Sequence, residues 1–103
     1  MNSEFLPEAA EEFHEAVLYY ENEAPGVGLR LVAEVRKGVT FITEHPYASP
    51  EVGGGIRKKV LNHFPYKLFY AVEHDLIMII AVAHQKRRPR FWRERLERSE
   101  PAD

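Results

Sequence analysis

Apolar residues in the first half of the chain recur at intervals of three and four, the spacing of one face of an α-helix. Residues 7–23 carry one such stripe and residues 27–44 carry another, with Ala24-Pro25-Gly26 between them. Pro7 favours a helix start, and His45-Pro46 favours a helix end. The pattern therefore predicts two antiparallel helices joined by a short turn, and this hairpin needs a further surface on which to bury both stripes.

The apolar spacing changes in the second half of the chain to the period of two that is typical of β-strands. Residues 56–61 and 66–73 alternate in this way, whereas residues 76–83 are apolar throughout, as expected for a central strand covered on both faces. The connections between these three segments are short, which favours an antiparallel meander. Residues 2–6 are a weaker candidate strand, and the glycine-rich residues 47–55 read as a loop.

The segments together predict one domain of the α+β class over residues 1–103. The expected order is β-α-α-β-β-β with a short C-terminal helix from about Pro89, and the helical hairpin packs on a curved antiparallel sheet. Gly28 and Gly38 lower the helix propensity, so close packing between the two helices is expected at both positions. The glutamates of the first helix are expected to form a solvated face: Glu8, Glu11, Glu12, Glu15 and Glu21.

Composition excludes several kinds of site. The chain contains no cysteine, so a disulfide, a thiolate zinc site and a cysteine nucleophile are not available. Its histidines show no metal-ligand spacing, and we expect neither a metal nor another cofactor. The apolar run 76–83 is too short to span a membrane, and the first residues lack the pattern of a signal peptide, so a cytoplasmic protein without a membrane partner is expected.

Charge is distributed unevenly along the chain. Residues 1–52 contain 10 acidic and 3 basic side chains, whereas residues 53–103 contain 6 acidic and 11 basic ones. A local basic surface can therefore meet an anionic partner although the whole chain carries a net charge of −2. Most of this basic charge follows directly after the apolar run: Lys86, Arg87, Arg88, Arg90, Arg93, Arg95 and Arg98.

The residues that could contact a target are the basic ones at the end of the apolar strand, with those of strand 56–61. Arg57 and Lys59 are expected on one face of that strand, and His84, Lys86, Arg87 and Arg88 begin where the apolar strand ends. Such a set could stabilise the charge of a phosphate transition state, with His84 transferring a proton. It could equally be a binding surface in which Trp92 and arginines are anchors. Each residue also has a purely structural alternative, for example Trp92 packing on the sheet.

Several of these residues carry a family resemblance. The sequence FPY at 64–66, Tyr70, the apolar strand and AVAHQKRRPRFWRER at 81–95 resemble the toxins of the RelE/ParE superfamily, and the likeness to the ParE branch is greater. The family pattern H-x-x-R-x-P-x-x-W-x-x-R is met by His84, Arg87, Pro89, Trp92 and Arg95. The resemblance extends over nearly the whole chain and implies the RelE-like fold.

The resemblance implies a toxin of a type II toxin–antitoxin module, and it leaves two targets open. ParE-type toxins bind DNA gyrase and stop replication without catalysis, which would make His84, Lys86, Arg87, Arg88, Trp92 and Arg95, together with Arg57 and Lys59, a binding surface. RelE-type toxins cleave messenger RNA on the ribosome, which would give His84, Arg87 and Arg57 catalytic roles. RelE-type enzymes commonly use a C-terminal tyrosine, and this chain has none after Tyr70. Gyrase inhibition is therefore the preferred prediction.

A protein partner is also implied by the resemblance. Toxins of this superfamily are neutralised by an acidic antitoxin of the ParD or RelB kind that is encoded in the adjacent gene. Its segment is expected to fold on the toxin surface. Leu18 and Tyr19 lie off the apolar stripe of the first helix and are candidate contacts.

Overall fold

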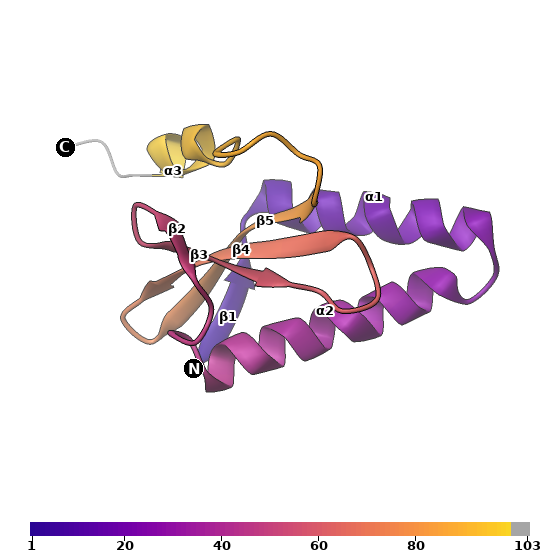
Figure 1. Ribbon diagram of the computed structural model, residues 1–103, viewed down its shortest axis with the longest axis horizontal. Helices are drawn as coiled ribbons and strands as arrows, with labels where there is room; N and C mark the ends of the chain where they lie inside the picture. Colours follow the sequence, from indigo (N-terminus) through magenta and orange to yellow (C-terminus); the bar gives the residue numbers. More distant parts are fainter. Residues whose placement is uncertain (100–103) are drawn as a thin grey trace.

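A sheet of five strands lies between two long helices and the C-terminal segment of the chain, which we define as residues 85–97 (Figure 1). The computed structural model describes residues 1–99 and the side chains of residues 1–97. The predicted basic residue Arg98 lies outside the described side chains. The elements are β1 (Asn2–Phe5), α1 (Pro7–Glu23), α2 (Val27–Glu44), β2 (Glu51–Gly53), β3 (Ile56–Val60), β4 (Tyr66–Glu73), β5 (Leu76–His84) and α3 (Arg93–Ser99).

The sheet has the strand order β1-β5-β4-β3-β2. The predicted antiparallel meander of β3, β4 and β5 is confirmed, and so is the α+β class. The sheet is mostly antiparallel, as predicted, and the exception is β1, which pairs with β5 in parallel from Asn2 opposite Leu76 to Phe5 opposite Ile79. Parallel pairing is available here because the helices and three strands separate β1 from β5, so no short hairpin fixes their direction.

The helical hairpin has the predicted boundaries, and its turn is held by a side chain that was expected to be solvated. The carboxylate of Glu21 accepts hydrogen bonds from the backbone N–H groups of Gly26 and Gly28, each at 2.9 Å. These donors lie at the start of α2, where N–H groups have no partner within the helix. Glu21 is exposed, as predicted, and its carboxylate also connects the last part of α1 to the first turn of α2.

Close packing explains both helix glycines, but only one of them by the predicted contact. A Cβ atom on Gly28 would lie 2.6 Å from the carbonyl oxygen of Val17, so this glycine lets α1 and α2 approach each other. A Cβ atom on Gly38 would instead meet Leu68 at 3.0 Å and Leu61 at 3.2 Å. Gly38 therefore serves the contact of α2 with the sheet, which the sequence pattern of one helix could not distinguish from a contact between helices.

The segment expected to be a loop at 47–55 contains the edge strand β2. Its Glu51 pairs with Arg57 and its Gly53 with Ile56 of β3. Gly54 and Gly55 connect the two strands with φ angles of +60° and +80°. Two-residue hairpin turns with positive φ at both positions favour glycine, so the Gly-Gly pair was a hairpin signal that the composition of the segment concealed.

The last helix begins at Arg93, later than the prediction of about Pro89. Arg90 has a φ angle of +62°, in the left-handed region, and a right-handed helix cannot continue through that conformation. Proline at position 89 therefore opens a turn here. The turn directs Phe91 and Trp92 onto the sheet, where both are buried.

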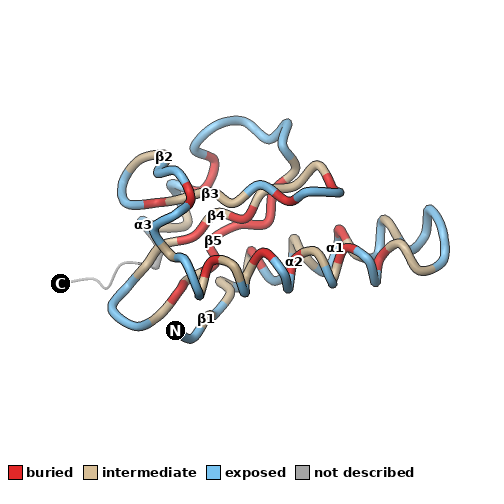
Figure 2. Tube along the Cα trace, turned by 60° about the horizontal axis from the view of Figure 1, so that its bottom comes forward, coloured by how far each residue is buried: buried red, intermediate tan, exposed pale blue. Residues whose placement is uncertain are grey.

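Two clusters of buried side chains cover the two faces of the sheet. The helices bury one face with residues such as Leu31, Ile42 and Leu68, and the C-terminal segment buries the other with Phe91 and Trp92. In Figure 2 the buried segments gather where the hairpin meets the sheet, and the tip of the hairpin that projects past the sheet is exposed. No helix within residues 1–99 is long and apolar enough to cross a membrane.

Candidate target-binding surface

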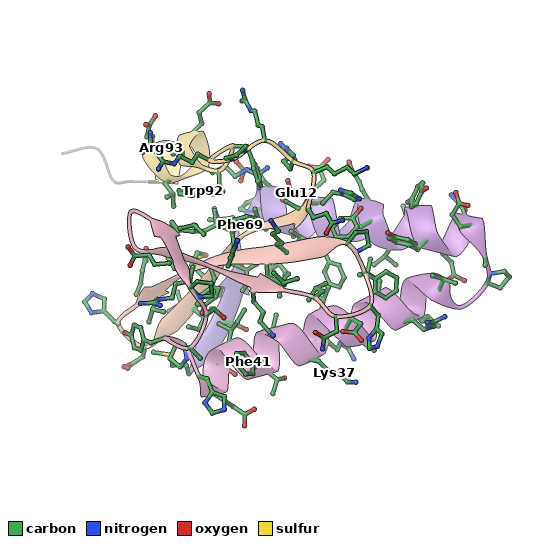
Figure 3. The ribbon with its side chains drawn as sticks, in the orientation of Figure 1. Glu12, Lys37, Phe41, Phe69, Trp92 and Arg93 are labelled. Carbon is green, nitrogen blue, oxygen red and sulfur yellow. The ribbon has the colours of Figure 1, made fainter. Side chains whose placement is uncertain are left out.

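The C-terminal segment is attached to the sheet by two aromatic side chains. Phe91 meets the ring of Phe69 edge-on with centroids 5.7 Å apart, and the indole of Trp92 lies 6.3 Å from the same ring. Figure 3 shows Phe69 and Trp92 together on one side of the sheet, away from Phe41 and Lys37 of α2. Trp92 is only 3% exposed. Its indole therefore holds the segment in place through packing, and little of its surface is available to a partner.

An ion pair attaches the same segment to the first helix. The guanidinium of Arg95 donates to both carboxylate oxygens of Glu12, at 2.8 and 2.6 Å. The pKa of Arg95 is raised above its ordinary value, chiefly by this hydrogen bond. The prediction that the glutamates of α1 form a solvated face was therefore wrong for Glu12, whose side chain points into the junction of α1, β5 and the C-terminal segment (Figure 3).

The pair also satisfies backbone groups of β5 beyond the end of β1. The pairing of β4 with β5 shifts by one residue between Phe69 and Tyr70, so Ile80 and Ala81 both face the C-terminal segment. Such a β-bulge leaves main-chain groups without ladder partners. The N–H of Val82 donates to Glu12 at 3.0 Å, and the carbonyl of Ile80 accepts from Arg95 at 3.1 Å. Glu12 and Arg95 thus stabilise the strand end from which the basic segment leaves.

Arg87 is the third member of this cluster and remains accessible. Its guanidinium lies 3.1 Å from Glu12 and 4.2 Å from the centre of the Phe91 ring, and its side chain is 47% exposed. An arginine stacked on a ring and paired with a carboxylate loses little further freedom when it contacts a partner. Arg87 is therefore presented to solvent in a defined position.

A basic pocket of about 260 Å³ lies between the C-terminal segment and the outer face of β3 and β4. Arg88 and Arg90 line it from the segment, and Lys58 and Lys67 line it from the two strands. Lys58 and Lys67 were missed as site residues by the sequence analysis. The alternation of β3 did place Lys58 on the face opposite Arg57 and Lys59, but it could not reveal which face the C-terminal segment would cover.

His84 lies at the rim of this pocket, at the end of β5. Its Nδ1 accepts a hydrogen bond from the backbone N–H of Lys86 at 3.1 Å, and its ring lies edge-on to that of Tyr66, with centroids 5.4 Å apart. Desolvation by burial raises the pKa of Tyr66, so its phenol stays protonated at neutral pH and is not a ready base. Lys86 lies two residues after His84 and is exposed.

Arg57 and Lys59 do not join the residues around His84. Arg57 donates to the backbone carbonyls of Ser49 at 2.7 Å and Tyr47 at 3.3 Å, which fixes the segment before β2. Lys59 lies 4.5 Å from the centre of the Phe41 ring on α2. Both side chains therefore occupy the helix-facing side of β3. The expectation of one continuous surface from Arg57 to Arg88 was wrong, because the sheet separates its two parts.

The arrangement favours binding over proton-transfer chemistry. Arg57 lies on the other side of the sheet from His84, and Arg95 is held by Glu12, so neither points toward the histidine. Within residues 1–99 no three histidine, aspartate or glutamate side chains are placed to hold a metal ion. The accessible part of the surface consists of Lys86, Arg87, Arg88 and Arg90 at one edge of the sheet, with His84 beside them.

Comparison with known proteins found a matching family model and similar solved structures, and it gave one negative result. A family model described as the ParE toxin of the type II toxin-antitoxin system, parDE, matches residues 4–89. A solved structure described as a chromosomal ParDE TA system from P. aeruginosa has a similar fold, with a TM-score of 0.72 and 18% sequence identity. The match covers 82% of this chain and 95% of the other. No curated protein gave a significant match.

Proposed function

Because the chain belongs to the ParE toxin family of type II toxin–antitoxin systems, we propose that it arrests growth by binding DNA gyrase and holding the enzyme on cleaved DNA. The observation that carries this proposal is the exposed basic edge formed by Lys86, Arg87, Arg88 and Arg90. These residues leave the sheet at the end of β5, and Trp92 and Arg95 fix the segment on its far side.

A basic edge of this kind is suited to binding by contact and charge. Arginines held beside packed aromatic rings are frequent anchors of protein interfaces, where the partner desolvates them on binding. Arg87 has this environment, because Phe91 lies beneath its guanidinium. Lys86 and Arg88 extend the positive charge on both sides and would speed encounter with an anionic target. His84, Lys86, Arg87 and Arg88 are the proposed contacts, and Trp92 and Arg95 position them.

Membership of the family implies an antitoxin as a partner. We propose that it is an acidic protein encoded in the adjacent gene, of the ParD or RelB kind. The hairpin offers it an apolar contact, since Leu18 is 49% exposed and Tyr19 is 58% exposed on the outer side of α1. Both partners would be met in the cytoplasm, where the proposed target acts.

Cleavage of messenger RNA on the ribosome is the alternative that the sequence left open. It would require Arg57, His84 and Arg87 to act on one phosphate. Arg57 is engaged by the carbonyls of Ser49 and Tyr47 on the helix-facing side of β3, which argues against a shared site. Lys58, not Arg57, lies on the same side of the sheet as His84. A lysine at that position could serve binding as readily as catalysis.

The experiment is a gyrase cleavage assay with purified protein, supercoiled plasmid and ATP. Accumulation of linear plasmid that depends on both proteins is expected. The same preparation is added to a reconstituted translation reaction, in which the messenger RNA is expected to stay intact. Cuts in ribosome-bound messenger RNA together with unaffected gyrase would contradict the proposal and support the alternative.

A further inference from the structure

The basic pocket between the C-terminal segment and the sheet has more positive charge than the fold itself uses. Its lining includes Lys58, Lys67, Arg87, Arg88 and Arg90, and no acidic side chain lines it. Among the described residues only Arg87 of this group forms an ion pair with a carboxylate. Cations that converge without a counter-charge repel one another, and a bound anion would relieve that repulsion.

The two lysines are fixed toward the pocket by the pairing of their strands. Lys58 of β3 lies opposite Phe69 of β4, and Lys67 of β4 lies opposite Val60. Strand side chains alternate between faces, so both lysines share the face that the C-terminal segment covers. A rigid sheet therefore supplies one wall of cations, and the turn around Arg88 and Arg90 supplies the other.

The floor of the pocket points to phosphate recognition and leaves little room for reading bases. Phe91 and Trp92 are buried, and the guanidinium groups of Arg87 and Arg95 lie over the ring of Phe91. Neither ring thus offers a free face for a stacked base, the usual platform in single-strand binding proteins. The volume of about 260 Å³ is also small for a drug-sized ligand and suits a phosphate with one attached sugar.

We propose that this pocket binds the phosphodiester backbone of single-stranded DNA without sequence preference. A nucleic-acid strand carries one negative charge for each nucleotide, which matches two facing rows of cations better than the sparser carboxylates of a peptide. A volume of about 260 Å³ holds a phosphate with its sugar, which suits a single strand better than a duplex. The choice of DNA over RNA rests on the proposed function, because a gyrase held in its cleaved state presents broken DNA strands.

The test uses the full chain and the intrinsic fluorescence of Trp92, the single tryptophan, which lies in the lining of the pocket. A poly-dT oligonucleotide of about ten nucleotides is titrated into the protein, and it is expected to change the Trp92 emission in a saturable manner. Each phosphate contact to a single strand changes the salt slope by about 0.7, so removing one contact at about 0.1 M salt costs roughly fivefold in affinity.

The double variant Lys58→Ala/Lys67→Ala is therefore expected to bind the oligonucleotide about 25-fold more weakly. The slope of log affinity against log salt concentration is expected to fall by about 1.4. The control is Arg30→Ala/Lys37→Ala, which removes the same charge from α2 on the other side of the sheet and is expected to bind as the parent does. Equal loss in both variants would show a delocalised charge effect and overturn the site.

Two competitors test the identity of the ligand. Poly-glutamate of equal charge that displaces the oligonucleotide as well as unlabelled DNA does would overturn the assignment to phosphate, and tenfold tighter binding of poly-U would overturn the assignment to DNA. The assay contains no gyrase. If the parent protein inhibits gyrase but does not bind the oligonucleotide, the pocket alone is contradicted. If it binds the oligonucleotide but does not inhibit gyrase, the proposed function alone is contradicted.

Discussion

Glu12 and Arg95 join the first helix to the last segment of the chain through two hydrogen bonds, at 2.8 and 2.6 Å. The pair lies beside the last part of β5, beyond the residues that pair with β1. It also binds the N–H of Val82 and the carbonyl of Ile80. A single carboxylate thus holds both the strand end and the basic segment that leaves it. The orientation of Arg87 depends on the same group.

Glu12→Ala is expected to lower the free energy of unfolding by about 3 kcal/mol, because it leaves a mostly buried guanidinium without its partner. Glu12→Gln is expected to cost less, since an amide oxygen can still accept from Val82. Urea denaturation provides the measurement. The control is Glu15→Ala, an exposed glutamate of the same helix, for which a change within about 0.5 kcal/mol is expected. Equal stability of the two alanine variants would refute the role of Glu12.

Arg87→Ala is expected to relieve growth arrest and leave folding intact. The side chain is half exposed, so its contact with Glu12 contributes at most about 1 kcal/mol to stability, and Arg95 still neutralises the carboxylate. Colony formation after induction measures the toxic effect, and binding of the antitoxin shows that the fold survives. A fully toxic Arg87→Ala variant would remove the basic edge from the mechanism.

Arg57→Ala separates the two candidate targets. The variant loses hydrogen bonds to the carbonyls of Ser49 and Tyr47 and is expected to be less stable by about 2 kcal/mol. At a temperature where the variant is still folded, gyrase inhibition is expected to remain within a few-fold of the parent. The loss of all toxic activity by a folded variant would instead favour a catalytic role for Arg57.

Alkaline pH is expected to destabilise the protein through Tyr66 and Tyr20. Desolvation raises the folded-state pKa of both phenols above the value of 10.0 for an exposed tyrosine. Their contribution to stability is therefore fully present below about pH 10 and is lost as the pH rises through the folded-state pKa, because the unfolded chain releases these protons first. Tyr66→Phe is expected to flatten the decline of the melting temperature above that pH. Tyr47→Phe, at an exposed position, serves as the control, and an equal effect of both changes would contradict the assignment.

Gly28→Ala and Gly38→Ala are expected to change the stability of the protein by different amounts, or in opposite directions, although both add one methyl group to α2. The new methyl at position 28 would meet a backbone oxygen at 2.6 Å, and overpacking of this kind costs about 1–3 kcal/mol. The methyl at position 38 meets the ends of Leu68 and Leu61, which can move, and the gain in helix propensity of about 1 kcal/mol offsets the contact. Thermal unfolding compares the two. A Gly38→Ala variant that melts lower than Gly28→Ala would contradict this account.

The sequence alone determined most of the secondary structure. Periodicity and the proline and glycine signals placed both helices at their observed boundaries and identified β3, β4 and β5, because these signals depend on residues close together in the chain. The motif from His84 to Arg95 was sufficient to indicate the family. The late start of α3 was missed, since the positive φ of Arg90 is not encoded in the local pattern. The strand β2 was missed because the glycine-rich composition of residues 47–55 concealed the hairpin signal of Gly54 and Gly55.

Tertiary structure alone decided which charged residues are available. The periodicity and charge of the sequence do not distinguish Glu12 from Glu15, or Arg95 from Arg88, yet Glu12 and Arg95 form a partly buried pair and the other two are exposed. Arg57 and His84 lie on opposite sides of the sheet, whereas Lys58 and Lys67 lie on the same side as His84. Which side each residue occupies matters because the helices cover one face of the sheet and the C-terminal segment covers the other. The role of a charged side chain depends on the residues that the fold brings into contact with it, and the spacing of residues along the sequence does not show which residues these are.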